Sequence, residues 1–100
     1  MVNDSGSNRD DSTSVRPDHV GAVDAVLDAT GLACPLPLLK AKQALYGLAG
    51  GQLLEVHATD AGSWRDMASF AEHSAHVLED RCQVDGVYYY WLRKAEDGDQ

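Results

Sequence analysis

A cysteine followed by two prolines one residue apart is the most distinctive chemical feature of the sequence. Cys34, Pro35 and Pro37 stand at the start of a leucine-rich segment, in the stretch DATGLACPLPLL of residues 28–39. Proline is tolerated in the first turn of a helix, where the backbone N–H groups have no acceptor within the helix. The two prolines therefore predict a helix that begins at residue 35, with Cys34 at its N-cap or next to it.

A thiol at the start of a helix has a particular chemistry. It lies at the positive end of the helix dipole and near unpaired backbone N–H groups, and both lower a thiol pKa below its ordinary value of about 8.5. We therefore expect Cys34 to be a usable nucleophile near neutral pH, suited to sulfur or redox chemistry. No histidine follows within the motif as a general base, so hydrolysis of the Cys/His type is poorly supported. A packed structural cysteine is the alternative, and the residue types alone leave it open.

The segments around this motif alternate between the periods of strands and helices. Strand patterns cover residues 23–28, 52–58, 76–84 and 87–93, and helical patterns cover residues 35–49 and 64–74. Asp85 and Gly86, between the last two strands, are a strong signal for a two-residue hairpin turn. The βαβαββ order predicts a two-layer α/β sandwich, in which a four-stranded mixed sheet carries both helices on one face.

Length and composition predict one small domain between two polar tails. Of the 100 residues, 44% are hydrophobic, which is enough for a small core and too little for a large internal cofactor site. Residues 1–20 are rich in Ser, Asp, Asn and Gly, and we expect a disordered N-terminal tail there. The domain is expected over residues 21–95, followed by an acidic C-terminal tail over residues 96–100.

The balance of charge favours protein partners over nucleic acid. Sixteen acidic residues against eight basic ones give a net charge of −8, whereas nucleic-acid binding normally relies on Lys and Arg to neutralise phosphates. No apolar run approaches the ~20 residues that span a bilayer, and the N-terminus lacks the basic and apolar pattern of a signal peptide. We expect a cytoplasmic protein that binds neither nucleic acid nor membrane and whose cysteines stay reduced.

The stretch LDATGLACPLPLLKAKQAL, which contains the C-P-x-P motif of Cys34, resembles the signature of the TusA/SirA family of small sulfur-carrier proteins. The resemblance covers residues 23–94 and includes Asp60, the pair Arg65-Asp66 and the closing stretch DGVYYYWLRK. It implies a two-layer α/β fold whose motif cysteine accepts a persulfide sulfur from a donor, such as a cysteine desulfurase or a rhodanese, and passes it to an acceptor protein.

The motif and the resemblance together select a small set of candidate site residues. Cys34 is the predicted catalytic residue, and the residues expected to support the motif are Gly31, Pro35 and Pro37. The residues expected to contact a partner are Lys42, Asp60 and Arg65. Positive charge near the thiol would attract an acidic partner and stabilise a persulfide anion, although a solvated helix face is an equal alternative. We expect no cofactor and no metal, because no ligand spacing supports a site built from His57, His73, His76 and Cys82.

The implied function is that of a persulfide carrier of the sulfurtransferase type without independent turnover. In the best-known branch of the family the relay feeds 2-thiolation of tRNA, and other branches serve molybdenum-cofactor assembly, selenium handling or sulfur oxidation. Ala71 stands where some members carry a second cysteine, so no paired-thiol mechanism through that position is available. Two alternatives stay open: a non-catalytic interaction or regulatory module, and a thiol–disulfide switch between Cys34 and Cys82, which needs Cα atoms within about 7 Å.

Overall fold

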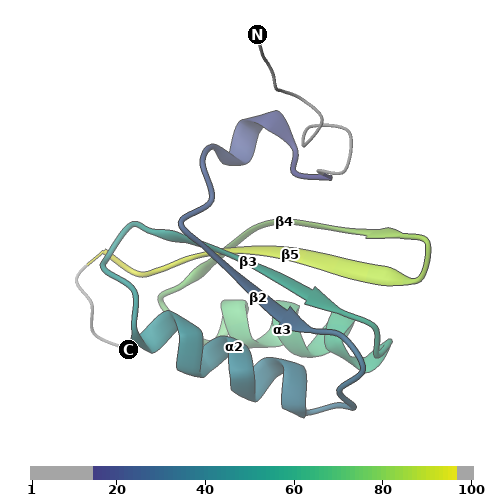
Figure 1. The fold of residues 1–100 in the computed structure, drawn as a ribbon. Coiled ribbons are helices and arrows are strands. Elements are labelled where there is room, and N and C mark those ends of the chain that lie inside the picture. The colour runs from purple at the N-terminus through teal and green to yellow at the C-terminus, as the bar shows by residue number, and fades with distance from the viewer. Residues whose placement is uncertain (1–14, 97–100) are drawn as a thin grey trace, which may run out of the picture.

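Residues 15–96 are described by the computed structural model, and in them a four-stranded sheet is covered on one face by two helices (Figure 1). The strands are β2 (Ala25–Ala29), β3 (Leu53–Ala58), β4 (Val77–Val84) and β5 (Val87–Arg93). The helices are α2 (Leu36–Tyr46) and α3 (Gly62–Glu72), and a short 3-10 helix, η1 (Asp18–Val20), precedes the first strand. The predicted two-layer α/β sandwich with βαβαββ order is confirmed.

The sheet is mixed, with strand order β2-β3-β5-β4. β2 and β3 are parallel, whereas β5 pairs antiparallel with both β3 and β4. Asp85 and Gly86 connect β4 to β5 with φ angles of 52° and 83°, as a type I′ hairpin turn requires. Because β2 and β3 are adjacent and parallel, they end at the same edge of the sheet, and the loops that lead into α2 and α3 begin side by side.

The helices pack on the sheet through a core of alternating strand residues. β3 contributes Leu54, Val56 and Ala58 to this face, and Tyr90 of β5 lies beside them. The other buried members of this core are Ala29, Ala41, Leu45, Met67 and Leu92. The apolar residues that give residues 35–49 their helical period face this core: Ala41 and Leu45 are fully buried, and Leu38 and Leu48 pack against it.

The second helix starts earlier than its sequence pattern predicts. Ser63, which comes directly before the predicted helix of residues 64–74, lies inside the first turn of α3 and is buried. Its hydroxyl donates to the carbonyl of Asp60 at 2.8 Å and lies 2.6 Å from the hydroxyl of Tyr90. The carboxylate of Asp60 instead accepts the N–H of Gly62 at 3.0 Å. The helix start is therefore stabilised by Asp60, while Ser63 joins α3 to the sheet.

The first helix ends at Tyr46, three residues before its predicted end. The ammonium group of Lys94, from just after β5, donates to the carbonyls of Leu45 and Leu48 at 2.6 and 3.0 Å. Lys94 is only 5% exposed. A lysine distant in sequence thus adds a charged donor to the carbonyl groups at the end of this helix, and no local pattern in residues 35–49 could indicate this.

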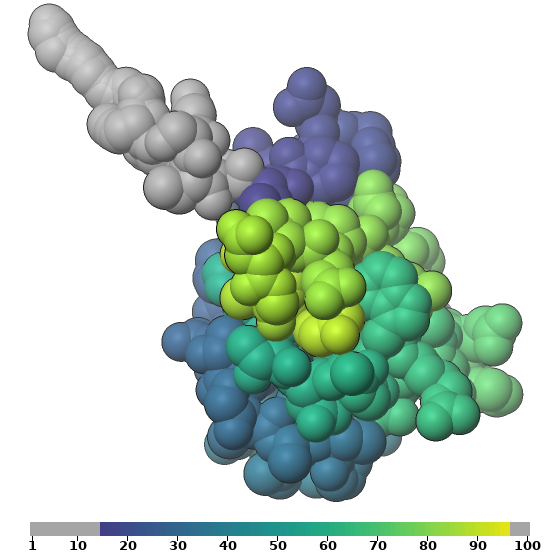
Figure 2. All heavy atoms as spheres, turned by 90° about the vertical axis from the view of Figure 1, so that its right-hand side faces the viewer, coloured from purple at the N-terminus to yellow at the C-terminus, as the bar shows by residue number. Residues whose placement is uncertain are grey.

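The face of the sheet opposite the helices is covered in part by the segment before β2. Val20 of η1 is 1% exposed and packs with Leu53 and Trp91, and Val15 and Val23 pack around them. Figure 2 shows this segment, in purple, against the β4–β5 hairpin, in yellow-green. The guanidinium of Arg93 holds the segment before β2 against the sheet by donating a hydrogen bond to the carbonyl of Val20 at 3.0 Å.

The packed chain therefore begins at Val15, before the predicted boundary at residue 21. An isolated valine among polar residues carries no periodicity, which is why the sequence pattern did not indicate the burial of Val20. Residues 1–14 and 97–100 lie outside the described residues, and the tails expected there stay predictions. Among residues 15–96, no helix has the length and apolar character needed to cross a bilayer.

Candidate functional site

Cys34 lies in the loop between β2 and α2, and its side chain is exposed. α2 begins at Leu36 with Pro35 as its N-cap, so Cys34 precedes the N-cap by one residue and is not the N-cap itself. Pro37 is buried in the first turn, and the Cys34–Pro35 peptide bond is cis. The prolines thus stand at the start of the helix, as predicted, and the thiol lies at the edge of the sheet where β2 and β3 end.

The loop that carries the thiol is tied to the neighbouring loop. The carboxylate of Asp28 accepts hydrogen bonds from the backbone N–H and the hydroxyl of Thr30, at 3.0 and 2.6 Å. Gly31 then donates its N–H to the hydroxyl of Thr59, after β3, at 2.8 Å. Gly31 has a φ of +82°, a conformation that glycine adopts without steric cost. This glycine therefore sets the path of the loop just before Cys34.

The first turns of α3 form the surroundings of the thiol. The Sγ atom of Cys34 donates a hydrogen bond to Oδ2 of Asp66 at 2.7 Å. At Gly62 the helix approaches so closely that an added Cβ would lie 3.3 Å from Sγ of Cys34 and 2.9 Å from Oδ2 of Asp60. The environment of Cys34 is thus built by the second helix as well as by the helix that follows it in sequence.

The pKa of the Cys34 thiol is raised, and the predicted lowering is wrong. The largest cause is the hydrogen bond to the Asp66 carboxylate, which stabilises the protonated thiol. Partial removal from water and the negative charges of Asp66 and Asp60 act in the same direction, and Arg65 acts against them. The dipole and the unpaired N–H groups of α2 were expected to lower this pKa, but the carboxylate of Asp66, at hydrogen-bond distance from the thiol, raises it. At neutral pH the resting Cys34 is therefore a thiol.

Two of the three predicted partner-contact residues lie at this site. Asp60 and Arg65 both act electrostatically on the thiol, and Arg65 is exposed. Lys42 does not lie at this site. It is six residues after Leu36, the first residue of α2, which is roughly 9 Å along the helix axis. Its ammonium group is 5.5 Å from the ring centre of Phe70 in α3.

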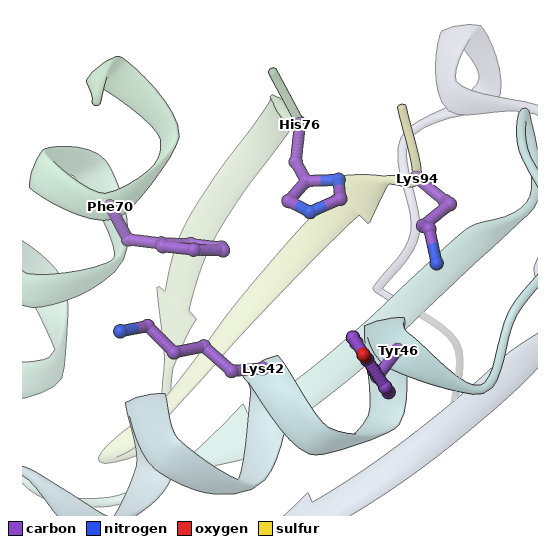
Figure 3. A pocket seen from close by; sticks show the side chains of 5 residues that line it. All are labelled: Lys42, Tyr46, Phe70, His76 and Lys94. Carbon is purple, nitrogen blue, oxygen red and sulfur yellow. The ribbon is translucent and has the colours of Figure 1, made fainter. Parts of the chain in front are cut away.

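Lys42 lines a separate small cavity between the C-terminal halves of the two helices. The cavity has a volume of about 260 Å³, and its other lining residues are Tyr46, Phe70, His76 and Lys94 (Figure 3). Two of the lining residues make hydrogen bonds within the fold. Nδ1 of His76 accepts the N–H of Ala95 at 3.0 Å, and Lys94 donates to carbonyls at the end of α2. The cavity is distinct from the Cys34 site.

The second cysteine lies on the other side of the sheet. Cys82, in β4, packs near Trp91 and Tyr89 on the face away from the helices, and burial is the main cause that raises its thiol pKa. Both cysteines are free. Because the sheet separates Cys82 from the thiol that contacts α3, this fold does not allow the direct Cys34–Cys82 disulfide considered above.

The histidines do not converge on Cys82 as a metal site would require. His57 pairs with Glu55 on the outer face of the sheet at 2.6 Å, whereas the ring of His73 bonds the carbonyl of Ser69 at 2.8 Å at the end of α3. Within the part of the chain that the structure describes, no cluster of three or more His, Cys, Asp or Glu side chains is arranged to hold a metal ion.

Sequence reasoning missed Asp66 and Gly62 as neighbours of the thiol. Neither residue was among the candidate site residues. The contact between Cys34 and Asp66 spans 32 residues, so no local spacing could indicate it. The pair Arg65-Asp66 within the family resemblance was the only available signal.

Gly62→Ala is expected to disturb the thiol more than it disturbs the fold. Gly62 is the first residue of α3, where the preference for alanine is at most the roughly 1 kcal/mol of a helix interior. This gain offsets part of the crowding, so the free energy of unfolding should change by less than about 1 kcal/mol. The new methyl group should displace Cys34 and weaken its hydrogen bond to Asp66, because it would lie 3.1 Å from Cβ of Cys34. Titration of thiolate absorbance in Cys82→Ser protein should then give a lower midpoint; an unchanged midpoint would show that the close approach does not control the thiol.

Comparison with known proteins identifies relatives over nearly the whole described chain. The family model described as "Sulfurtransferase TusA" matches residues 25–94. The sulfur carrier protein TusA of Pseudomonas aeruginosa is 43% identical over 76 residues, which cover 76% of this chain and 96% of the relative. TusA of Pseudomonas putida is 45% identical over 74 residues, covering 74% of this chain and 92% of the relative. The crystal structure of a SirA-like protein from Desulfitobacterium hafniense superposes with a TM-score of 0.64 at 27% identity and covers 72% of this chain and 99% of that one.

Proposed function

Because this chain belongs to the TusA family of sulfur carrier proteins, we propose that Cys34 carries the sulfur, accepting it as a persulfide from a donor protein and passing it to an acceptor. The observation that carries the proposal is the exposed thiol of Cys34 in the C-P-x-P motif, at the edge of the sheet where both helices begin. An exposed thiol on a small domain is accessible to the active-site cysteine of a larger protein.

The chemistry of such a carrier needs a reachable thiol and little else. In uptake, a sulfur–sulfur bond forms at Cys34 as the donor's sulfur–sulfur bond breaks, so that one neutral sulfur atom moves and the donor regains a thiol. Delivery is the same exchange in the opposite direction. No external oxidant or reductant is consumed, and the carrier has no turnover without its partners.

The surface around the thiol supports docking by proteins. Leu36 and Leu39, in the first turns of α2, are 44% and 46% exposed. Asp60 and Arg65 flank the thiol from the side of α3. We propose that the donor, a cysteine desulfurase or a rhodanese, and the acceptor both contact these residues, and that Lys42, farther along α2, is a contact outside this surface.

The pathway we propose is tRNA 2-thiolation or related sulfur trafficking in the cytoplasm. Other branches of the family handle molybdenum-cofactor assembly, selenium or sulfur oxidation, and neighbouring genes distinguish them. Enzymes of thiouridine synthesis would indicate tRNA as the destination of the sulfur, whereas enzymes of sulfite or thiosulfate metabolism would indicate sulfur oxidation.

The alternative of a non-catalytic interaction module is weakened by the position of Cys34. A cysteine that served only packing would be buried, and this one is exposed. Slow alkylation of the free protein at pH 7 would not restore that alternative, because the hydrogen bond to Asp66 accounts for a protonated thiol.

Mapping the added sulfur tests the proposal directly. After incubation with a cysteine desulfurase and cysteine, the intact protein should gain mass corresponding to sulfur. Digestion without reductant should place that sulfur on the peptide containing Cys34 and leave the peptide containing Cys82 unmodified. Sulfur located only on Cys82, or no gain in mass with several desulfurases and rhodaneses, would contradict the assignment.

A further inference from the structure

The hydrogen bond between Cys34 and Asp66 joins a candidate nucleophile to a carboxylate held on a well-packed helix. The distance of 2.7 Å between Sγ and Oδ2 is within the range for direct proton transfer between heavy atoms. Asp66 is half-buried, and the residue that follows it, Met67, is fully buried in the core. This turn of α3 therefore holds the carboxylate in place beside the thiol.

The packing of α3 on the sheet further limits movement of this carboxylate. Arg81 of β4 donates to the carbonyl of Trp64 at 2.6 Å, and its guanidinium lies 3.9 Å from the ring centre of the same residue. One turn of the helix thus presents Trp64 to the sheet and Asp66 to the thiol. A group held in this way keeps its orientation without a cost at the moment of reaction.

We infer that Asp66 is the proton acceptor for sulfur uptake, its carboxylate receiving the thiol proton of Cys34 as Sγ attacks the outer sulfur of a donor persulfide. The inference rests on the proposed function, to which it adds a second catalytic residue in direct contact with the reacting atom.

Atoms and electrons balance in this step. The S–H bond of Cys34 breaks and its proton passes to Oδ2 of Asp66, while a bond forms between Sγ and the outer sulfur of the donor's –S–SH group. The donor's sulfur–sulfur bond breaks, and its electron pair stays on the inner sulfur as a thiolate. Transfer of the proton from Asp66 to that thiolate leaves a donor thiol, a persulfide on Cys34 and an ionised Asp66.

The other ionisable groups around the thiol are not placed for this task. Those that act on it in the described part of the chain are Asp60, Arg65 and Asp66. The carboxylate of Asp60 accepts the N–H of Gly62, and Arg65 is a cation with no capacity to accept a proton. Tyr90, which interacts with Asp66, has its own hydroxyl paired with Ser63 and a pKa raised by burial.

Because the pKa of Cys34 is raised, a proton acceptor beside the thiol makes sulfur uptake faster at neutral pH. A thiol whose pKa lies above the ordinary value supplies little thiolate at neutral pH. Uptake that depended on free thiolate would therefore be slow, whereas removal of the proton during the attack uses the abundant thiol form.

The test compares the pH dependence of sulfur uptake in wild type and Asp66→Asn, both with Cys82→Ser. Glutathione persulfide serves as the donor, so that no docking surface is involved and the ionisation of the donor is common to both proteins. Wild type should load at least about tenfold faster at pH 6.5, a conservative value for a general base. The ratio should fall towards one near pH 9, because Asp66→Asn must wait for thiolate, whose fraction rises about tenfold per pH unit.

Asp60→Asn is the matched control, because it also removes one negative charge near the thiol. Its rate should show the wild-type dependence on pH, whatever its absolute value. Titration of thiolate absorbance should give a lower midpoint in Asp66→Asn than in wild type, which separates loss of a proton acceptor from loss of a folded site.

Two results would overturn the inference while leaving the proposed function intact. One is equal or faster uptake by Asp66→Asn at every pH from 6.5 to 9, which would show that the carboxylate only restrains the thiol. The other is a thiolate midpoint that does not move. Failure of wild type to load Cys34 from any donor would instead contradict the proposed function and the inference with it.

Discussion

Replacing Cys34 by serine is expected to abolish sulfur loading, whereas Cys82→Ser is expected to load as wild type does. Serine has nearly the shape of cysteine but cannot form a sulfur–sulfur bond. Intact mass after incubation with a cysteine desulfurase and cysteine should show added sulfur in wild type and in Cys82→Ser, and none in Cys34→Ser. The expected effect is the loss of all signal, the largest of any single substitution in this protein.

The structure makes this pair of variants a fair comparison. Cys34 is exposed, so its replacement should change the free energy of unfolding by no more than about 0.5 kcal/mol. Cys82 is partly buried beside Trp91, and a hydroxyl there should cost about 1 kcal/mol. If the less stable Cys82→Ser loads and the more stable Cys34→Ser does not, loss of folding cannot explain the difference. Equal loading of both variants would contradict the role of Cys34.

Removing residues 1–20 is expected to destabilise the domain by roughly 2–4 kcal/mol. Full burial of one valine stabilises by about 1.5–3 kcal/mol, and Val20 is 1% exposed. The truncation also removes Val15 from the same cluster and exposes part of Trp91. Arg93 loses its hydrogen bond to the carbonyl of Val20 and keeps the one to Gly51. For a domain of this size the unfolding midpoint should fall by at least about 10 °C, as measured by thermal unfolding.

A shorter truncation provides the control. Removing residues 1–14 keeps Val15 and Val20, and the polar composition of residues 1–14 predicts a midpoint close to that of the full chain. Val20→Ala in the full chain should lower the midpoint by part of the effect of the longer truncation. Sulfur loading at low temperature should survive in all three variants, because the cluster lies on the face of the sheet away from the helices, whereas Cys34 lies at the edge of the sheet against α3. Equal midpoints for the two truncations would show that the buried valines contribute no stability.

Much of the fold could be predicted because its signals are local. Alternation predicted β5 at residues 87–93 with correct bounds, and Asp85-Gly86 predicted the hairpin turn. The ends of the helices could not be predicted as well, since α2 ends where Lys94 binds its carbonyls and α3 begins where Asp60 accepts an N–H. Lys94 reaches the end of α2 only in the folded protein, and the side chain of Asp60 takes its position at the start of α3 when the helix packs on the sheet.

The sequence by itself determined the order of the elements, the position of Cys34 before a helix and the family to which the chain belongs. Periodicity, proline and turn residues act over a few neighbouring positions, and the C-P-x-P motif is likewise read from consecutive residues. Tertiary structure decided the chemical state of the thiol, because the carboxylate that holds its proton lies 32 residues away along the chain. It also decided that Val20 belongs to the packed domain and that Cys82 stands apart from the site. The physical reason is the same in each case: pKa values and burial depend on distances in space, and for these residues the distances are set by how α3 and the N-terminal segment pack on the sheet.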